Sequence, residues 1–215
     1  LDFNDTISYG TATISAAKSF LSSSSEAAGS ASSNHKLDNG PMEGSGALSD
    51  SSNLDAPENT GEEYSFDTQT YPYRALLSDS AKSVYNQIYA NAVAYNTDIF
   101  TLVESLSESE LSDTMNCVFN DHPELFWLNT SYKYGYDKSG KAVQVQLSFG
   151  ISKADLSSAK TAFDSAVNAI VSGAASYSTE IEKELYIHDA ICALSTYDTA
   201  ASLNQSAYSA LVSGS

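Results

Sequence analysis

Residues 126–149, FWLNTSYKYGYDKSGKAVQVQLSF, carry the clearest structural signal in this 215-residue chain. Every second position of the first half, up to Tyr136, is aromatic, aliphatic or β-branched, and the return half alternates in the same way from Val143. Asp137–Gly140 supplies turn residues between the halves. The stretch therefore predicts an antiparallel β-hairpin with a loop of about four residues.

Helical periodicity flanks the hairpin on both sides, because apolar residues recur there at spacings of three and four. Ser78 is a candidate N-cap, and Ser107 and Thr179 each stand three residues before a glutamate, which is capping-box spacing. The predicted helices cover residues 77–92, 107–122, 156–173, 179–192 and, as a short fifth segment, 205–212. We therefore expect an α+β fold, mainly helical, with a small antiparallel hairpin.

The first part of the chain has a different composition. Residues 1–20 show short β-like alternation without a clear partner. Residues 21–63 are rich in Ser, Ala, Gly, Asn, Asp and Glu and contain no aromatic residue. Such a stretch buries too little apolar surface to offset its ordering entropy. We predict a disordered, flexible linker at 21–63, followed by a helical and hairpin domain at 64–215.

The charge balance narrows the classes of partner. The chain has 10 Lys and Arg residues against 27 Asp and Glu residues, a formal net charge of -17. An acidic surface repels phosphate backbones and anionic lipid, so we expect no nucleic-acid partner. No run of about 18 apolar residues predicts a transmembrane segment. The start at Leu1 rather than Met, with abundant Ser, Ala, Asn, Thr and Tyr, favours a secreted or cell-surface bacterial protein whose leader has been removed.

Three segments together resemble bacterial transglutaminase-like proteins, whose core is the papain-like cysteine-nucleophile fold. The first is DHPELFW at 121–127, which leads into the Tyr-rich strand. The second is YIHD at 186–189, followed by TYD at 196–198, and the third is QSAYSALVSG at 205–214. In that family the third stretch leads into a Gly-x-x-Val-Cys-like sequence, where the catalytic cysteine opens a helix. The triad His and Asp follow downstream.

The resemblance covers about residues 71–214 and has a direct consequence for function. The chain ends at Ser215, before any such nucleophile, so we expect an incomplete transglutaminase-like domain with no catalytic, cofactor-binding or metal-binding residue and no cofactor. The expected function is a non-catalytic N-terminal portion of a secreted transglutaminase-like protein. Its downstream part would perform cysteine-based acyl transfer or peptide hydrolysis. The helix bearing His188 and the segment 207–214 would support that site.

An alternative from a different class is a self-sufficient, non-enzymatic binding module at the cell surface. Its partner would be an extracellular protein or a cell-wall peptide. The support is the long linker and the tyrosine row at Tyr132, Tyr134 and Tyr136, whose aromatic faces and polar tips suit a peptide or sugar platform. The row is also consistent with a hairpin face packed on helices, and this is the interpretation we favour.

The two cysteines, Cys117 and Cys192, form no Cys-x-x-Cys pair, so a structural zinc site is not indicated. Both lie inside predicted helices rather than at helix N-termini, where a thiolate is stabilised. We interpret them as small buried hydrophobic residues, and a single disulfide between them stays open.

Other polar residues invite functional interpretations. A divalent-metal site formed by Asp121, His122, His188 and Asp189 is one possibility. We instead predict that His188 is a buried core histidine with Asp189 pointing outward, and that Asp121 to Glu124 shape a helix exit through local bonds. Five glutamates occupy first turns of helices, where they favour the helix dipole rather than a glycosidase carboxylate pair. They are Glu108, Glu110, Glu180, Glu182 and Glu184.

Overall fold

The computed structural model describes residues 43–196, 198, 203 and 206–214. This part of the chain divides into two compact units. Unit 1 contains the residues up to His122 together with Thr130–Ser148. Unit 2 contains Pro123–Asn129 and the residues from Phe149 onward.

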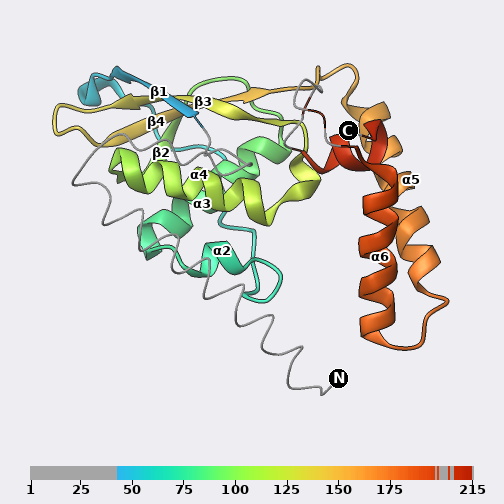
Figure 1. The fold of residues 1–215 in the computed structure, drawn as a ribbon. Coiled ribbons are helices and arrows are strands. Elements are labelled where there is room, and N and C mark those ends of the chain that lie inside the picture. The colour runs from blue at the N-terminus through green and yellow to red at the C-terminus, as the bar shows by residue number, and fades with distance from the viewer. Residues whose placement is uncertain (1–42, 197, 199–202, 204–205, 215) are drawn as a thin grey trace. The chain divides into compact units, whose positions relative to one another are not determined.

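Unit 1 is built around a four-stranded mixed sheet in the order β1-β3-β4-β2 (Figure 1). The predicted hairpin is confirmed as β3 and β4, and its turn is closed by the Asp137 N–H, which donates to the Lys141 carbonyl at 2.8 Å. β2 pairs antiparallel with β4, and β1 pairs parallel with β3. The strands are β1 (Glu43–Leu48), β2 (Phe100–Leu106), β3 (Leu128–Tyr136) and β4 (Ala142–Phe149).

Helices α3 (Asp79–Val93) and α4 (Glu108–Asp121) lie on one side of this sheet, as Figure 1 shows. Both begin at the predicted caps, Ser78 and Ser107. α3 packs on α4 and β2, and the short α2 (Pro72–Ala75) packs on α4. The apolar stripes of both helices form the core of the unit, which includes Val84, Ile88, Leu111, Met115 and Val118. The α+β class is thus confirmed.

Two strands of the sheet depart from the predicted fold. The sequence of β2, FTLVESL, lacks regular alternation, and its register with β4 shifts between Thr101 and Leu106. β1 lies inside the predicted linker, of which residues 1–42 are outside the described part. Residues 43–63 differ from a flexible linker, since they include β1, a 3-10 turn at Ser51–Asn53 and the buried Gly61. The folded unit therefore begins before residue 64.

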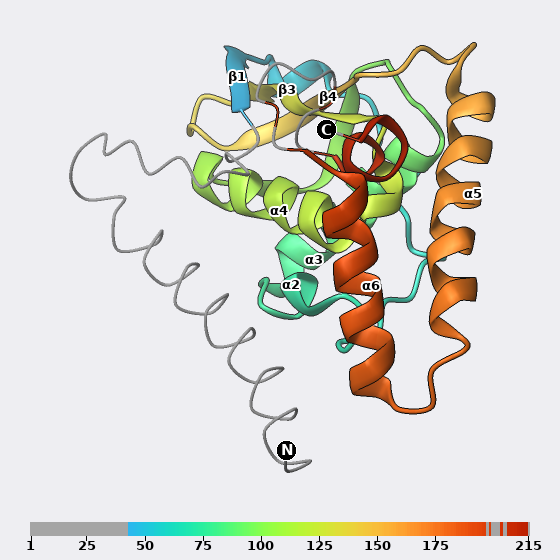
Figure 2. The ribbon, with the colours of Figure 1, turned by 45° about the vertical axis from the view of Figure 1, so that its right-hand side comes forward.

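Unit 2 contains α5 (Leu156–Ala174), α6 (Glu180–Leu194) and a short π-helical turn, η3 (Ser209–Ser213). α5 and α6 run side by side (Figure 2), and both contact η3. The Phe126 ring lies 4.8 Å from the rings of both Phe163 and Tyr208, which ties η3 to α5. The predicted fifth helix thus appears as η3, while Gln205 is outside the described residues.

The C-terminal end of α5 needs a correction. The helix predicted at 156–173 ends with Gly173, whereas α5 continues to Ala174 and is capped by Ala175. A Cβ on Gly173 would lie 2.5 Å from Cζ of Tyr186. Gly173 therefore serves the close packing of α5 against the Tyr186 ring of α6.

Candidate functional site

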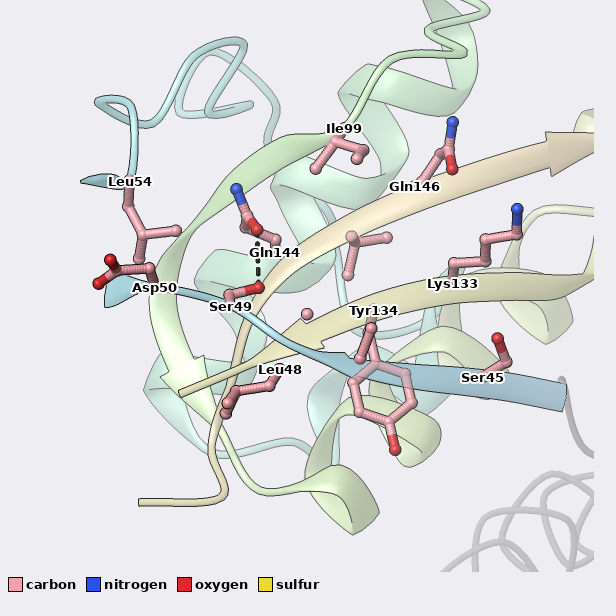
Figure 3. Close-up of a pocket in the computed structure, with 13 residues that line it drawn as sticks. Ser45, Leu48, Ser49, Asp50, Leu54, Ile99, Lys133, Tyr134, Gln144 and Gln146 are labelled. Carbon is pink, nitrogen blue, oxygen red and sulfur yellow. Dashed lines mark hydrogen bonds between the residues drawn. The ribbon is translucent and has the colours of Figure 1, made fainter. Parts of the chain in front are cut away.

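The face of the sheet that carries Ser131 and Lys133 has two adjoining hollows of about 460 and 470 Å³. Both hollows lie within unit 1 and share Ser45 of β1, Lys133 of β3 and Gln146 of β4. Figure 3 shows these three side chains rising from neighbouring strands. The hollows form one shallow surface, which we call the sheet-face groove.

Short side chains and amides shape the sheet-face groove. Ser49 Oγ donates to Gln144 Oε1 at 2.8 Å, and Gln146 Nε2 donates to the Thr97 carbonyl at 3.0 Å. Each glutamine amide uses one end in such a bond and carries a further donor or acceptor at the other end. The groove therefore offers both kinds of hydrogen-bonding group, as an extended peptide main chain requires.

The rim of the groove is mixed in character. Leu48 and Ile99 are large exposed apolar side chains at its margin, and Leu54 adds a third. Lys133 and Asp50 provide one charge of each sign. The lining residues include no histidine or cysteine. This composition suits binding of a polar ligand with apolar side groups.

A buried polar network lies elsewhere in unit 1, at the end of α4. The Tyr85 hydroxyl lies 2.8 Å from His122 Nε2 and donates to Asp121 Oδ2 at 3.0 Å. The Asp121 carboxylate also accepts the main-chain N–H groups of Tyr73, at 3.2 Å, and Arg74, at 2.8 Å. Burial raises the pKa of Asp121, although these hydrogen bonds oppose the rise.

The surroundings of this network are aromatic and closed. Rings of Phe66, Tyr71 and Tyr89 lie within 5.4 Å of the His122 ring, and His122 is buried. α4 ends at Asp121, so the predicted role of this segment in the helix exit is confirmed. His122 differs from the prediction, because it contacts the hydroxyl of Tyr85, which lies 37 positions away in the sequence. The network ties α2, α3 and α4 together and is structural.

On α6 the structure places three chemically suggestive residues together. His188 Nδ1 lies 3.1 Å from Asp189 Oδ1, and Cys192 Sγ lies 3.8 Å from His188 Nε2. The prediction of a buried His188 is wrong, since its side chain is 71% exposed, while Asp189 points outward as expected. Cys192 lies in the last turn of α6, away from the helix N-terminus that stabilises a thiolate. Within the part of the chain that the structure describes, the side chains of this group are exposed to water.

The rest of the predicted apolar face of α6 is also exposed. Ile181 is 45% exposed and Leu185 is 59% exposed, and no residue of α6 is buried. The helical spacing predicted a stripe correctly, but the stripe is uncovered by the described residues of unit 2. We call Ile181, Leu185, His188 and Cys192 the α6 stripe.

The remaining candidates have structural roles. Both cysteines are free; Cys117 is buried as predicted, whereas Cys192 is exposed. Burial, with nearby aspartates, raises the pKa of Cys117 to about 12. Glu110 and Glu182 complete the two capping boxes, and hydrogen bonds from Ser107 and Thr179 lower the pKa values of these carboxyls. Glu108, Glu110, Glu180 and Glu182 thus lie in first turns, as expected, whereas Glu184 lies one turn further along α6.

Tyr132 and Tyr134 of the tyrosine row border the sheet-face groove, and Figure 3 shows the Tyr134 ring directed away from the Lys133 side chain. Tyr132 is 4% exposed, and Tyr134 and Tyr136 are half-buried. Tyr132 bonds to the Ser112 side chain and Tyr134 to the Glu108 side chain, both on α4. The tyrosine row is therefore packed against a helix, which is the interpretation that the sequence favoured. The rings of Tyr132 and Tyr134 also lie against the glycines of β1.

Metal binding and membrane insertion find no support in the described part of the chain. There, no cluster of three or more His, Cys, Asp or Glu side chains could hold a metal ion. Asp121 and His122 belong to unit 1, whereas His188 and Asp189 belong to unit 2. Among the described helices, none has the length and apolarity needed to cross a membrane.

No known protein family, no curated protein and no solved structure gives a match to this chain.

Proposed function

We propose that this chain is a non-catalytic, supporting region of a secreted transglutaminase-like protein. The observation that carries the proposal is the α6 stripe, since Ile181 and Leu185 are large apolar side chains left exposed on a helix that has no buried residue. The stripe includes His188 of the YIHD segment, one of the three segments that resemble the family. The α6 stripe would pack against the catalytic region of the parent protein.

In this proposal the chemistry belongs to that catalytic region. A cysteine thiolate there would attack a glutamine carboxamide or a peptide bond, break its C–N bond and form a thioester, and the nitrogen would leave, after taking up a proton, as ammonia or as the amine of the cleaved peptide. The role of α6 and η3 would be to position the helix that carries the cysteine, because both precede it in the family. Cys192 would take no part, and Cys192→Ser should leave the activity of the parent protein unchanged.

The direct test is to read the parent gene on the 3′ side of the sequence that encodes this chain. A continuing frame with a Gly-x-x-Val-Cys-like segment, followed by His and Asp codons, is the expected result. A stop codon at that point would refute the proposal.

A second test uses the protein itself. A hydrophobic dye should bind the folded chain, and Ile181→Lys with Leu185→Lys should remove most of that binding without changing the circular dichroism spectrum. The matched control is Val171→Lys on α5, whose side chain is also exposed but lies outside the stripe. Equal dye binding by the stripe variant and the control would contradict the role of the stripe.

A second candidate is a cell-surface binding module, and the sheet-face groove is the observation that favours it. Its amides, hydroxyls and Lys133 would hold an extended peptide of the cell wall or of an extracellular protein. The test is sedimentation of the labelled protein with purified cell-wall material. Lys133→Ala combined with Gln146→Ala should abolish co-sedimentation, whereas Lys138→Ala in the hairpin turn should not. Co-sedimentation that survives the double substitution would exclude the groove.

A further inference from the structure

The edge strand β1 lies on unit 1 with little side-chain anchorage. All of its residues from Gly44 to Leu48 are exposed, and Leu48 is 64% exposed. Its sequence, EGSGAL, is poor in the β-branched and aromatic residues that favour strands. It pairs with β3 in the parallel arrangement, which is slightly less stable per residue than the antiparallel one. Main-chain pairing and shape therefore account for its place in the sheet.

The fit of β1 against β3 depends on two glycines of β1 that lie against two tyrosine rings of β3. A Cβ on Gly44 would lie 2.8 Å from Cζ of Tyr132, and a Cβ on Gly46 would lie 2.8 Å from Cζ of Tyr134. The Tyr132 ring is buried and bonded to α4, so it has no room to swing away. The edge of β3 therefore excludes a larger residue at the Gly44 position, and at the Gly46 position a larger residue would have to displace the half-buried Tyr134 ring.

The spacing of the rings matches the repeat of an extended peptide. The Tyr132 and Tyr134 ring centroids are 6.3 Å apart. A strand advances about 6.6 Å over two residues, so each ring meets every second residue of the neighbouring strand. The tyrosine row therefore already serves as a platform for a peptide, with the chain's own segment on it.

We propose that the β3 edge with Tyr132 and Tyr134 is a binding site for an extended peptide that carries glycine at alternate positions and runs parallel to β3. β1 occupies this site as a built-in competitor. Main-chain hydrogen bonds to β3 supply the affinity, and the two tyrosines supply the selectivity, as in strand addition to a sheet edge. This inference does not depend on the proposed transglutaminase-like function.

Unit 1 has the means to release β1 without unfolding. The chain after β1 is anchored separately, because the Glu58 and Asn59 carbonyls accept hydrogen bonds from the side chains of Gln87 and Asn91 on α3. At the near end, the Ser49 N–H donates to the Tyr136 carbonyl at 2.7 Å. Residues 50–57 lie between these two anchors and form the hinge. The core between α3, α4 and β2 contains no residue of β1.

Because β1 occupies the β3 edge, it lowers the apparent affinity of the protein for an external peptide. A tethered segment acts at an effective concentration of about a millimolar or more. An external peptide of equal intrinsic affinity must displace it, so the wild-type protein should bind only weakly. Removing β1 from the site should strengthen binding by at least about tenfold.

The experiment uses the full chain and a fluorescent synthetic peptide with the sequence of residues 41–50. Gly44→Val together with Gly46→Val in the protein should displace β1 and raise the affinity for this peptide at least about tenfold over wild type. A control peptide with valine at the same two positions should not bind. Binding of the valine peptide, or no binding by the folded double variant, would overturn the proposal.

A second experiment, with a disulfide that fixes β1 to β3, tests the proposal even if the Gly44→Val, Gly46→Val variant does not fold. Ser45 and Lys133 are partners across β1 and β3, so Ser45→Cys with Lys133→Cys can pin β1 in place. The background carries Cys192→Ser to remove the exposed thiol. The reduced protein should bind the glycine peptide as weakly as the wild-type protein does, and the oxidised protein should show no binding. Equal binding in both states, or none in either, would overturn the proposal.

Discussion

Replacing Tyr85 by phenylalanine removes one oxygen atom from the centre of unit 1. The Tyr85 side chain is fully buried, and its hydroxyl contacts both Asp121 Oδ2, at 3.0 Å, and His122 Nε2, at 2.8 Å. The ring itself stays, so the variant keeps the packing against Phe66. The substitution therefore isolates the hydrogen bonds of the network.

The expected loss follows from those two contacts. A hydrogen bond to a charged group contributes about 1.5–3 kcal/mol, and removing one partner of a buried polar group costs about 1–3 kcal/mol. The two terms overlap because one hydroxyl serves both partners. We expect Tyr85→Phe to lower the free energy of unfolding of unit 1 by about 2–4 kcal/mol.

Urea denaturation followed by circular dichroism measures this loss. The single tryptophan, Trp127, lies in unit 2, so its fluorescence reports on the other unit in the same sample. Tyr64→Phe is the matched control, since the Tyr64 ring is only half-buried and keeps its edge contact with Tyr89. A loss below about 0.5 kcal/mol for Tyr85→Phe, or a loss equal to that of the control, would refute the stabilising role of the network.

Three further predictions concern the stability of unit 1. Gly61→Ala should cost about 3 kcal/mol in urea denaturation, because Gly61 has a φ of 73° and a Cβ there would lie 2.5 Å from the Asn86 carbonyl carbon. Gly140 has a φ of 80° but open space around it, so Gly140→Ala should cost only about 1 kcal/mol. Equal costs for Gly61→Ala and Gly140→Ala would contradict the steric argument. Burial raises the pKa of Tyr132 to about 12, so its contribution to stability is complete below pH 10 and is lost as the pH rises to 12. Tyr132→Phe should reduce the loss of thermal stability over this range, and the part that remains belongs to Tyr134, whose pKa is also raised to about 12. Burial and a neighbouring glutamate raise the pKa of Asp113, so the charged carboxylate destabilises the folded state at pH 7. Asp113→Asn should therefore raise the melting temperature at pH 7. A gain in melting temperature that persists below pH 4 would exclude ionisation of Asp113 as its cause.

The helices and the hairpin were predictable because their signals are local. The capping boxes at Ser107 and Thr179 involve residues only three positions apart, and the hairpin turn at Asp137–Gly140 joins adjacent strands. β1 and β2 were missed because long-range partners determine them. β1 pairs with residues about 88 positions away, and its two glycines suit Tyr132 and Tyr134 rather than any local rule.

The candidate site could be predicted only in part. Lys133, Gln144 and Gln146 are the polar residues that alternate with the predicted inward-facing positions of the hairpin, so a polar outer face was foreseeable. Its concave shape depends on Ser45 and its neighbours in β1, which the composition assigned to a linker. Periodicity likewise located the face of α6 that holds His188. It could not show whether another element covers that face, and this is why the burial of His188 was wrongly predicted.

The two units differ in how completely each one buries its apolar faces, and this difference bears on function. In unit 1 both main helices bury their stripes, and the described residues contain no buried side-chain nitrogen or oxygen without a partner. In unit 2, α6 keeps Ile181 and Leu185 in solvent although its capping box specifies the helix firmly. Evenly scattered apolar residues need no explanation, but a stripe at helical spacing does. The sheet-face groove and the β3 edge therefore fit transient peptide partners, whereas the α6 stripe fits a permanent one.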